Sequence, residues 1–547
     1  MTFFEEIVAQ IKTIWSNMTP KEISRFLFLF TLILCMILGL DGGILFSSDA
    51  YAYFYSIKLF AETGRLFSST SVPYFIEVSG IYLSPYPLGY SLLSIPFYLA
   101  FKITAGSEIL GPRFANMLIF SLSVYFTNEF ANDLKNKAFG LLSALILIFG
   151  TFAIEQVTHI WSHIPSMFFI LLTIRYLFLY EKRDNNKYLY ISSFSSGIAF
   201  WIRYFNIVLT ILIFLYLLMK YRQKIKVYLS FPIIFLIVIS PTLLYHQVYF
   251  GNAFITPYAY HPLQQSFQKF DVLYLRYTVW YMLVEYHPYP IAYTPAAYFH
   301  SSLLESAPLL ILSIPGFYLL YKDFKEFFLI LLAHFWIIVL FYGMFVSWDG
   351  GWCLSMRHLT DTLPFLSIAV ARYAQYQIKK LQNNIFIVIS GVIGLIIIAA
   401  LFWILISIDF YQTIVITRRV AVNQISRYIA LSIAISMGTL LLATVKRGKK
   451  IEQILIICLF ALVLLAVAWT LFLNVGLNII MWTSGGNRVL PLLDWIIMLL
   501  KLPGYDDRYT GPIISYPLYL TIFSMTVVLF ILNLVYPTLI KKSKRRI

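Results

Sequence analysis

Residues suited to chemistry lie at the edges of long apolar stretches rather than within them. Asp49, in the sequence Ser-Ser-Asp-Ala-Tyr-Ala-Tyr, closely follows the first such stretch. A charge is costly at the centre of a bilayer, but at its edge a carboxylate can stay ionised and can reach a group in the lipid headgroup layer. Alternatively, Asp49 caps the amphipathic segment that runs on to Gly64.

Glu155, His159 and His163 form a second candidate group, spaced four residues apart. If the segment is helical, this spacing places all three on one face. Two imidazoles and one carboxylate are a donor set that binds divalent metals, so a metal site is one alternative. The sequence alone does not establish metal binding there.

Arg203, in Phe-Trp-Ile-Arg-Tyr-Phe-Asn, lies at the tip of a predicted hairpin between two apolar stretches. An arginine at that depth is costly unless it is paired. A guanidinium binds phosphate oxygens through two parallel hydrogen bonds, so the phosphate of a lipid is a suitable partner. The alternative is that the side chain extends to the lipid headgroups without a specific partner.

A fourth group lies in Ser-Trp-Asp-Gly-Gly-Trp-Cys-Leu-Ser-Met-Arg-His-Leu, which begins at residue 347. The paired glycines allow a ligand to approach the backbone closely. Trp348 and Trp352 can stack on a sugar ring, while Arg357 and His358 can meet a phosphate or pyrophosphate. The alternative is a belt of aromatic residues at the membrane surface.

The composition excludes a water-soluble globular protein. Hydrophobic residues make up 60% of the 547 residues, charged residues only 12%, and the mean hydropathy is +0.79. The net charge of +16 falls in short clusters between apolar stretches, so it indicates membrane topology and not a nucleic-acid partner. The three cysteines predict neither a disulfide framework nor a cysteine metal site. The charged opening argues against a removed signal peptide.

Fourteen apolar runs are long enough, or nearly so, to span a bilayer. They fall near residues 25–46, 113–131, 138–154, 161–180, 188–202, 204–219, 227–248, 303–320, 327–346, 358–376, 384–408, 427–445, 453–474 and 514–537. A fifteenth run, 88–104, is short and contains Pro96. We interpret it as a helix that lies in the interface or enters and leaves on one side.

The distribution of basic residues predicts the sides of the membrane. With the basic C-terminus taken as cytoplasmic, alternate connections and the tail hold 23 basic residues, and the longer opposite loops from residue 155 onward hold ten. This asymmetry follows the positive-inside rule. It predicts that both termini are cytoplasmic and that Asp49 lies outside, in a large first loop over 47–112.

Three of these features together resemble GT-C glycosyltransferases. They are the acidic residue after the first membrane helix, an arginine at the start of the second span (Arg113, in Gly-Pro-Arg-Phe-Ala-Asn), and the Trp-x-Gly-Gly-Trp…Arg-His-Leu…Pro-Phe motif. The closest family patterns are those of protein O-mannosyltransferases and aminoarabinose transferase-like enzymes. The family often has Gly-Pro before the motif arginine, where this chain has Ser355 and Met356. The resemblance therefore does not determine the conformation of the backbone turn there.

The resemblance implies an all-α polytopic membrane protein with about 14 transmembrane helices and juxtamembrane helices in the first external loop. Residues 1–376 are expected to form the GT-C-like module, with external loops 47–112, 155–161, 248–302 and 347–357. Residues 377–547 are expected to add transmembrane helices with external loops 409–426 and 475–512.

The resemblance also implies an activity: inverting transfer of a sugar from a polyprenyl-phosphate carrier to a glycan, lipid or protein acceptor on the outer face of the cell membrane. It implies that Asp49 is the general base or orients the acceptor, and that Arg113 is one of the external arginines. Glu155, His159 and His163 match the place where oligosaccharyltransferase relatives carry a second acidic site, so sugar contact is preferred there over metal binding. The donor is the polyprenyl-phosphate-linked sugar, and a divalent metal stays open as a cofactor.

Two other classes of function stay open on the sequence. External arginines also suit a transporter or flippase of lipid-linked or anionic substrates, although such proteins commonly place ionisable residues deep within their helices. An oligosaccharide ligase or polymerase that uses lipid-linked substrates is the other alternative. A ligase or polymerase of this kind does not require an acidic residue after the first helix.

Overall fold

The structure, a computed structural model, describes residues 18–38, 48–105, 108–157, 159–260, 271–284, 302–345 and 355–380, together with residues 463, 466 and 467. The four apolar runs expected after residue 380 and the external loops 409–426 and 475–512 lie outside these residues, as do about half of the loop 248–302 and most of the loop 347–357. Trp348 and Trp352 lie outside them as well. The predicted division at residue 376 and the total of 14 helices therefore stay predictions.

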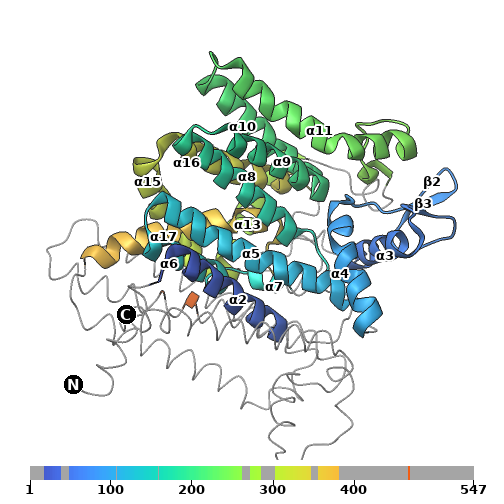
Figure 1. The fold of residues 1–547 in the computed structure, drawn as a ribbon, viewed down its shortest axis with the longest axis horizontal. Helices are drawn as coiled ribbons and strands as arrows, with labels where there is room; N and C mark the ends of the chain where they lie inside the picture. The colour runs from blue at the N-terminus through green and yellow to red at the C-terminus, as the bar shows by residue number, and fades with distance from the viewer. Residues whose placement is uncertain are drawn as a thin grey trace, which may run out of the picture.

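The described chain is mostly helical, and its long helices fall on the apolar runs (Figure 1). The α-helices are α2 (Pro20–Leu38), α3 (Ser48–Thr63), α4 (Gly89–Ala105), α5 (Leu110–Leu134), α6 (Lys137–Phe149), α7 (Ala153–Val157), α8 (His163–Arg183), α9 (Asn186–Ile202), α10 (Ile207–Lys220), α11 (Ile225–Phe250), α13 (Leu275–Leu283), α14 (Leu303–Ser306), α15 (Ser313–Asp323), α16 (Lys325–Gly343) and α17 (Leu363–Lys380). Short 3-10 helices are η1 (Tyr204–Asn206), η2 (Pro257–Tyr260), η3 (Val272–Tyr274), η5 (Pro308–Leu312) and η6 (Arg357–Thr362).

Local sequence explains several of these boundaries. At the start of α2, the Thr19 and Glu22 side chains each bond to the other's backbone N–H, which is a capping box. The run predicted over 303–320 is divided into α14, η5 and α15, and η5 begins at Pro308, whose ring disfavours a helical conformation at the preceding residue. The run predicted over 358–376 begins as the 3-10 helix η6 before α17 continues it.

Three described helices are long and apolar enough to cross a membrane: α8, α11 and α16. They differ in their surroundings, because 83% of the most apolar part of α8 is buried by other helices, against 17% for α11. The outer surface of α11 carries exposed residues such as Ile233 and Ile237. α8 therefore lies within the bundle, and α11 has an exposed apolar surface on the outside of the described bundle.

The first external loop contains a small β-sheet that the all-α prediction did not include. Strands β1 (Phe67–Ser68), β2 (Ile76–Val78) and β3 (Ile81–Leu83) pair antiparallel in the order β1-β3-β2. Ser79 and Gly80, both with positive φ, connect β2 to β3 as a tight two-residue turn. The inner face of the sheet packs on the end of α11, at Tyr245 and Phe250.

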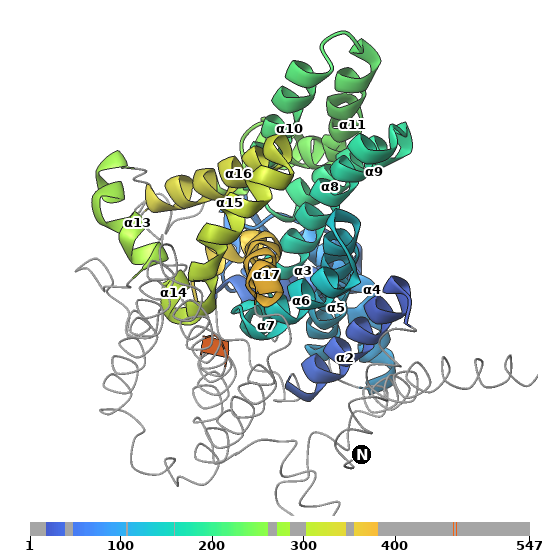
Figure 2. The same ribbon diagram turned by 90° about the vertical axis from the view of Figure 1, so that its left-hand side faces the viewer.

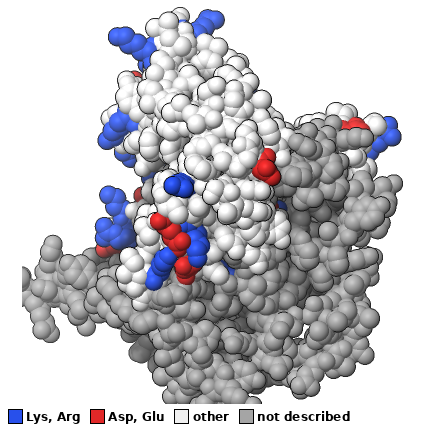
Figure 3. Space-filling view, turned by 90° about the vertical axis from the view of Figure 1, so that its right-hand side faces the viewer, with Lys and Arg blue, Asp and Glu red and all other residues white. Residues whose placement is uncertain are grey.

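The helices of the same loop, α3 and α4, pack on each other and α4 packs on α5. α4 and α5 are so close that a Cβ on Gly111 would lie 2.5 Å from the carbonyl oxygen of Phe97. On the outer side Lys58 pairs with Glu108 at 2.7 Å, and Lys102 pairs with Glu62. These mixed charges stand out on an otherwise largely uncharged face (Figure 3). Their partial exposure suits a helix pair at the membrane surface better than one in lipid.

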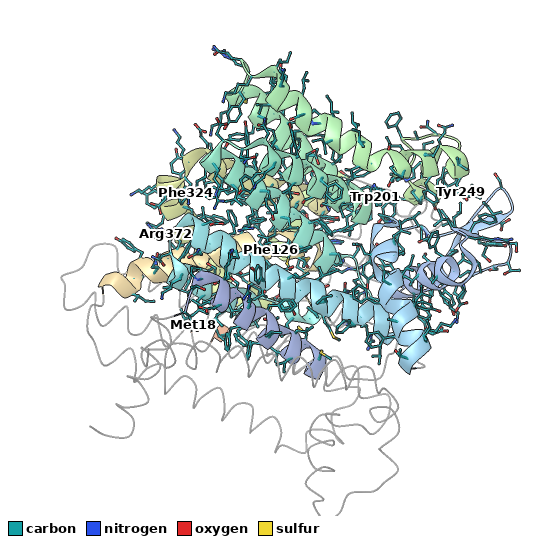
Figure 4. The ribbon with its side chains drawn as sticks, in the orientation of Figure 1. Met18, Phe126, Trp201, Tyr249, Phe324 and Arg372 are labelled. Carbon is teal, nitrogen blue, oxygen red and sulfur yellow. The ribbon has the colours of Figure 1, made fainter. Side chains whose placement is uncertain are left out.

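The described bundle has two chemically different ends. At the basic end, ion pairs join turns and helix ends that the sequence analysis placed on one side: Arg175 to Asp133 (3.0 Å), Lys220 to Glu181 (3.1 Å) and Arg372 to Asp323 (2.7 Å). α3, α4, the sheet and the end of α11 occupy the opposite end, here called the site end (Figure 1). In Figure 4, Phe324 and Arg372 mark the basic end, and Trp201 and Tyr249 lie toward the site end. The sides of the membrane on which these two ends lie stay a prediction.

α17 runs through the middle of the described bundle, with α15 and α6 beside it (Figure 2). Its contact with α15 depends on Gly316, because a Cβ there would lie 1.9 Å from the carbonyl oxygen of Ala369. No side chain fits between backbones at that separation.

We predict that Gly316→Ala destabilises the protein by about 1–3 kcal/mol, because the added methyl group forces α15 and α17 apart. Thermal unfolding of the purified protein in detergent measures the effect. Ile314→Ala is the matched control on the same helix, because Ile314 is 70% exposed. Equal melting temperatures for Gly316→Ala and the wild type would contradict the close contact.

Candidate functional site

Asp49 lies in the first turn of α3, at the site end of the bundle. Its Oδ2 atom is 2.9 Å from Nη1 of Arg357, and its Oδ1 atom accepts a hydrogen bond of 2.5 Å from the hydroxyl of Tyr86. The Asp49 side chain is 20% exposed and that of Arg357 is 11% exposed. The predicted acidic residue and the arginine of the predicted motif are therefore direct partners.

Tyr86, which the sequence analysis did not select, lies between β3 and α4. Burial and the neighbouring Asp49 carboxylate raise the pKa of this tyrosine well above its usual range, so the hydroxyl stays protonated and donates to Asp49. Pro85 and Pro87 flank Tyr86 and restrict its backbone. A tyrosine between two prolines in an external loop is a signal that sequence reasoning could have used.

Arg357 also lies over an aromatic surface. Its guanidinium carbon is 5.2 Å from the centre of the Trp161 ring, and the His159 ring stacks on the same tryptophan at 4.1 Å. The Asn116 amide fixes this segment by donating to the carbonyl oxygens of His159 (2.6 Å) and Trp161 (3.1 Å). A cation–π contact holds the guanidinium over the tryptophan ring without using the N–H donors that bind an anion.

Arg203, predicted to meet a phosphate, is joined to a carboxylate of the protein. Its Nη1 atom donates to Oδ2 of Asp361 at 2.8 Å, and its Nη2 atom donates to the Tyr342 hydroxyl at 2.6 Å. The His358 ring stacks on Tyr342 with a centroid distance of 4.0 Å. Asp361 was not selected from the sequence, although it lies in the predicted motif, where an acidic residue four positions after Arg357 was the available signal.

Glu155, His159 and His163 do not share one helical face. α7 ends at Val157 and α8 begins only at His163, so the four-residue spacing spans a bend. Within the described ranges, no three His, Cys, Asp or Glu side chains are grouped as a metal site. Glu155 instead accepts a hydrogen bond from the hydroxyl of Ser355, which also accepts one from the Gln156 amide at 3.0 Å.

Ser355 is the position at which this chain departs from the family motif. Its hydroxyl bonds to a residue 200 positions earlier and so fixes the approach to η6. His163 and His358 face each other with ring centres 6.2 Å apart. Arg113 is only 2% exposed on α5, and its charge acts on His159.

The short helix η6 brings these groups together. Arg357 at its start pairs with α3, and Asp361 pairs with Arg203 at the end of α9. Asp49, Glu155, His159, His163, Arg203, Arg357 and His358 thus gather at the site end, joined by Tyr86, Trp161, Tyr342 and Asp361. Such a site offers a carboxylate beside guanidinium and aromatic groups, which suits an anionic ligand that also carries a ring.

We expect Asp361→Asn to destabilise the protein by about 3–5 kcal/mol, because Arg203 would keep a buried charge without its counter-ion. Thermal unfolding in detergent measures this, and the double variant Arg203→Met/Asp361→Leu should recover much of the loss. Asp323→Asn at the basic end is the control, with an expected effect below about 1 kcal/mol because its pair with Arg372 is more exposed. Similar losses for the two single variants would show that the Arg203–Asp361 pair is not a buried one.

His159 gives a pH dependence of stability. Burial, together with the charges of Arg113 and Arg357, lowers the pKa of His159 to about 3. Between this pKa and the usual value near 6.5, the unfolded chain binds a proton that the folded chain does not, so this residue lowers stability by about 1.4 kcal/mol per pH unit on acidification.

His159→Phe keeps a ring to stack on Trp161 and removes this titration. We therefore predict that the fall in melting temperature between about pH 7 and about pH 5 is smaller in His159→Phe than in the wild type. The comparison is made on both proteins in the same detergent. An equal fall in the two proteins would show that His159 is not buried in its neutral form.

Comparison with known proteins gives a family match over part of the chain, and a fold. The model of the dolichyl-phosphate-mannose-protein mannosyltransferase family (PMT_2) matches residues 92–245, which include Arg113 and Arg203 but neither Asp49 nor η6. No curated protein matches the chain in a sequence search.

Solved structures match over most of the chain. ArnT from Cupriavidus metallidurans in the apo state is 13% identical, with 84% of this chain and 77% of that chain covered and a TM-score of 0.51. The same protein bound to undecaprenyl phosphate is 12% identical, with 82% and 77% covered and a TM-score of 0.50. The oligosaccharyltransferase of Archaeoglobus fulgidus in its apo form is 12% identical, with 79% and 56% covered and a TM-score of 0.44. The chain therefore has the fold of ArnT, and the resemblance to GT-C membrane glycosyltransferases expected from its sequence is confirmed.

Proposed function

We propose that this protein is an inverting glycosyltransferase of the membrane, which moves a sugar from a polyprenyl-phosphate carrier to an acceptor on the extracytoplasmic face. The observation that carries the proposal is the position of Asp49. It lies at the site end of a GT-C fold, within 2.9 Å of the guanidinium of the Trp-x-Gly-Gly-Trp…Arg-His-Leu motif.

In this proposal Asp49 acts as the general base. The acceptor hydroxyl oxygen attacks the anomeric carbon, its proton passes to the Asp49 carboxylate, and the bond from that carbon to the phosphate oxygen breaks. A single displacement at the anomeric carbon inverts its configuration. Tyr86 orients the carboxylate through its hydrogen bond to Oδ1.

The arginines stabilise the leaving phosphate, on which negative charge develops during the reaction. Arg357 contacts it directly, because its guanidinium faces Asp49, whose carboxylate is 20% exposed. Arg203 holds η6 in place through Asp361, and Arg113 adds positive charge behind His159. His358 meets the phosphate beside Arg357, Trp348 and Trp352 stack on the sugar, and Glu155, His159 and His163 contact it. No metal is required for these steps.

A lipid-linked donor has independent support. One of the ArnT structures with this fold is bound to undecaprenyl phosphate. The exposed apolar surface of α11 allows a lipid chain to lie beside the bundle. The acceptor is a glycan, a lipid or a protein. The basic turns at the opposite end support a site outside the cytoplasm, with both termini inside.

The test is transfer from a panel of radiolabelled polyprenyl-phosphate sugars by the purified protein. One donor should be consumed by the wild type, and Asp49→Asn should lower the rate by about 10²–10⁴-fold because the base is lost. Glu77→Gln, which changes an exposed acid in the same loop, is the matched control and should keep full activity.

Unchanged transfer by Asp49→Asn would remove Asp49 as the base. If the wild type consumed no donor of the panel, the transferase proposal would fail. Movement of the lipid between leaflets without transfer would favour a flippase instead.

A further inference from the structure

The two carboxylate–guanidinium pairs of the site differ in their access to water. In the Arg203–Asp361 pair the carboxylate side chain is 2% exposed, and Tyr342 holds the same guanidinium. In the Arg357–Asp49 pair the carboxylate is 20% exposed. The two arginine side chains are about equally exposed, 11% for Arg357 and 10% for Arg203, so it is the carboxylate of Asp49 that makes its pair the more open of the two.

We propose that the Asp49–Arg357 ion pair is exchanged during the reaction: the phosphate of the donor takes Arg357 from Asp49, and this exchange frees Asp49 to act on the acceptor. The inference rests on the proposed function, because it assigns the phosphate to Arg357 and the acceptor to Asp49. It adds an order of events, in which donor binding precedes activation of the base.

The surroundings of the pair confine the exchange to one side chain. The backbone of η6 is anchored by the fully buried Met356 and Leu359, and by the pair between Asp361 and Arg203. On the other side, Tyr86 holds Oδ1 of Asp49, which leaves Oδ2 as the atom that changes partner.

Rotation of the Arg357 side chain along the face of Trp161 is therefore sufficient, since the tryptophan contact needs no hydrogen bond from the guanidinium. The five N–H donors of the guanidinium suit a phosphate as well as a carboxylate.

The exchange changes the chemistry of Asp49. In the ion pair, Oδ2 of Asp49 lies 2.9 Å from Nη1 of Arg357, so the guanidinium occupies the atom that the acceptor hydroxyl must reach. When the phosphate takes Arg357, Oδ2 can accept the hydrogen bond and then the proton of the acceptor hydroxyl. Asp49 can then act as a base only when a donor is bound for the acceptor hydroxyl to attack.

Binding of undecaprenyl phosphate to purified protein in detergent tests the exchange without catalysis. In the wild type the lipid must break the ion pair, whereas Asp49→Asn leaves Arg357 without this competitor. We expect Asp49→Asn to bind about three- to tenfold more tightly than the wild type. Asp49→Ala is the second variant, and the melting temperature of each protein checks its folding.

Three controls make the result specific. In the Arg357→Gln background, the change Asp49→Asn should alter the affinity little, because no ion pair is left to break. Undecaprenol, which lacks the phosphate, should show no difference between wild type and Asp49→Asn. Asp323→Asn removes an arginine-paired carboxylate at the basic end and should bind undecaprenyl phosphate like the wild type.

Equal or weaker binding by both Asp49 variants would overturn the exchange and show that Arg357 bridges carboxylate and phosphate. Tighter binding that persists with Arg357→Gln would also overturn it, because it would come from net charge alone. The transfer assay on the wild type decides the proposed function separately, so failure of the exchange leaves that proposal standing.

Discussion

The arrangement of the site depends on the pairing of charged side chains that are only partly hydrated at the edge of the membrane. η6 contributes an arginine to one ion pair and an aspartate to another, and these pairs tie it to α3 and to the end of α9. A buried or half-buried charge without its partner would be costly, so each pair fixes the position of two segments that are distant in sequence. The groups proposed to react are among those that hold the segments together, so the proposed function would couple stability and chemistry at this end of the bundle.

The sequence predicts much of this end of the molecule, because charged residues beside apolar stretches can be recognised from the order of residues alone. Asp49, Arg203 and Arg357 were selected for this reason, and the basic clusters predicted which connections lie together. The described helices α5, α8 and α11 begin and end within a few residues of the expected spans.

The rest could not be predicted because it depends on contacts between distant residues. Nothing in the sequence distinguishes Asp361 from the other aspartates. Its pairing with Arg203, which lies 158 residues earlier in the chain, is decided by packing. The strands of the first loop have two or three residues, too few for an alternating pattern to be recognised. The spacing of Glu155, His159 and His163 suggested a helix, but the chain bends after Val157.

The hydrogen bond between Ser355 and Glu155 has a consequence for biosynthesis. Glu155, Asp49 and Arg203 are all synthesised before residues 355–361, so a shorter nascent chain lacks Ser355, Arg357 and Asp361, three of the partners described above. These contacts form only when that segment, which includes most of η6, arrives. A polypeptide released before that point would hold these charges at the bilayer edge with some of their partners missing, a feature by which membrane quality control can distinguish it from the finished protein.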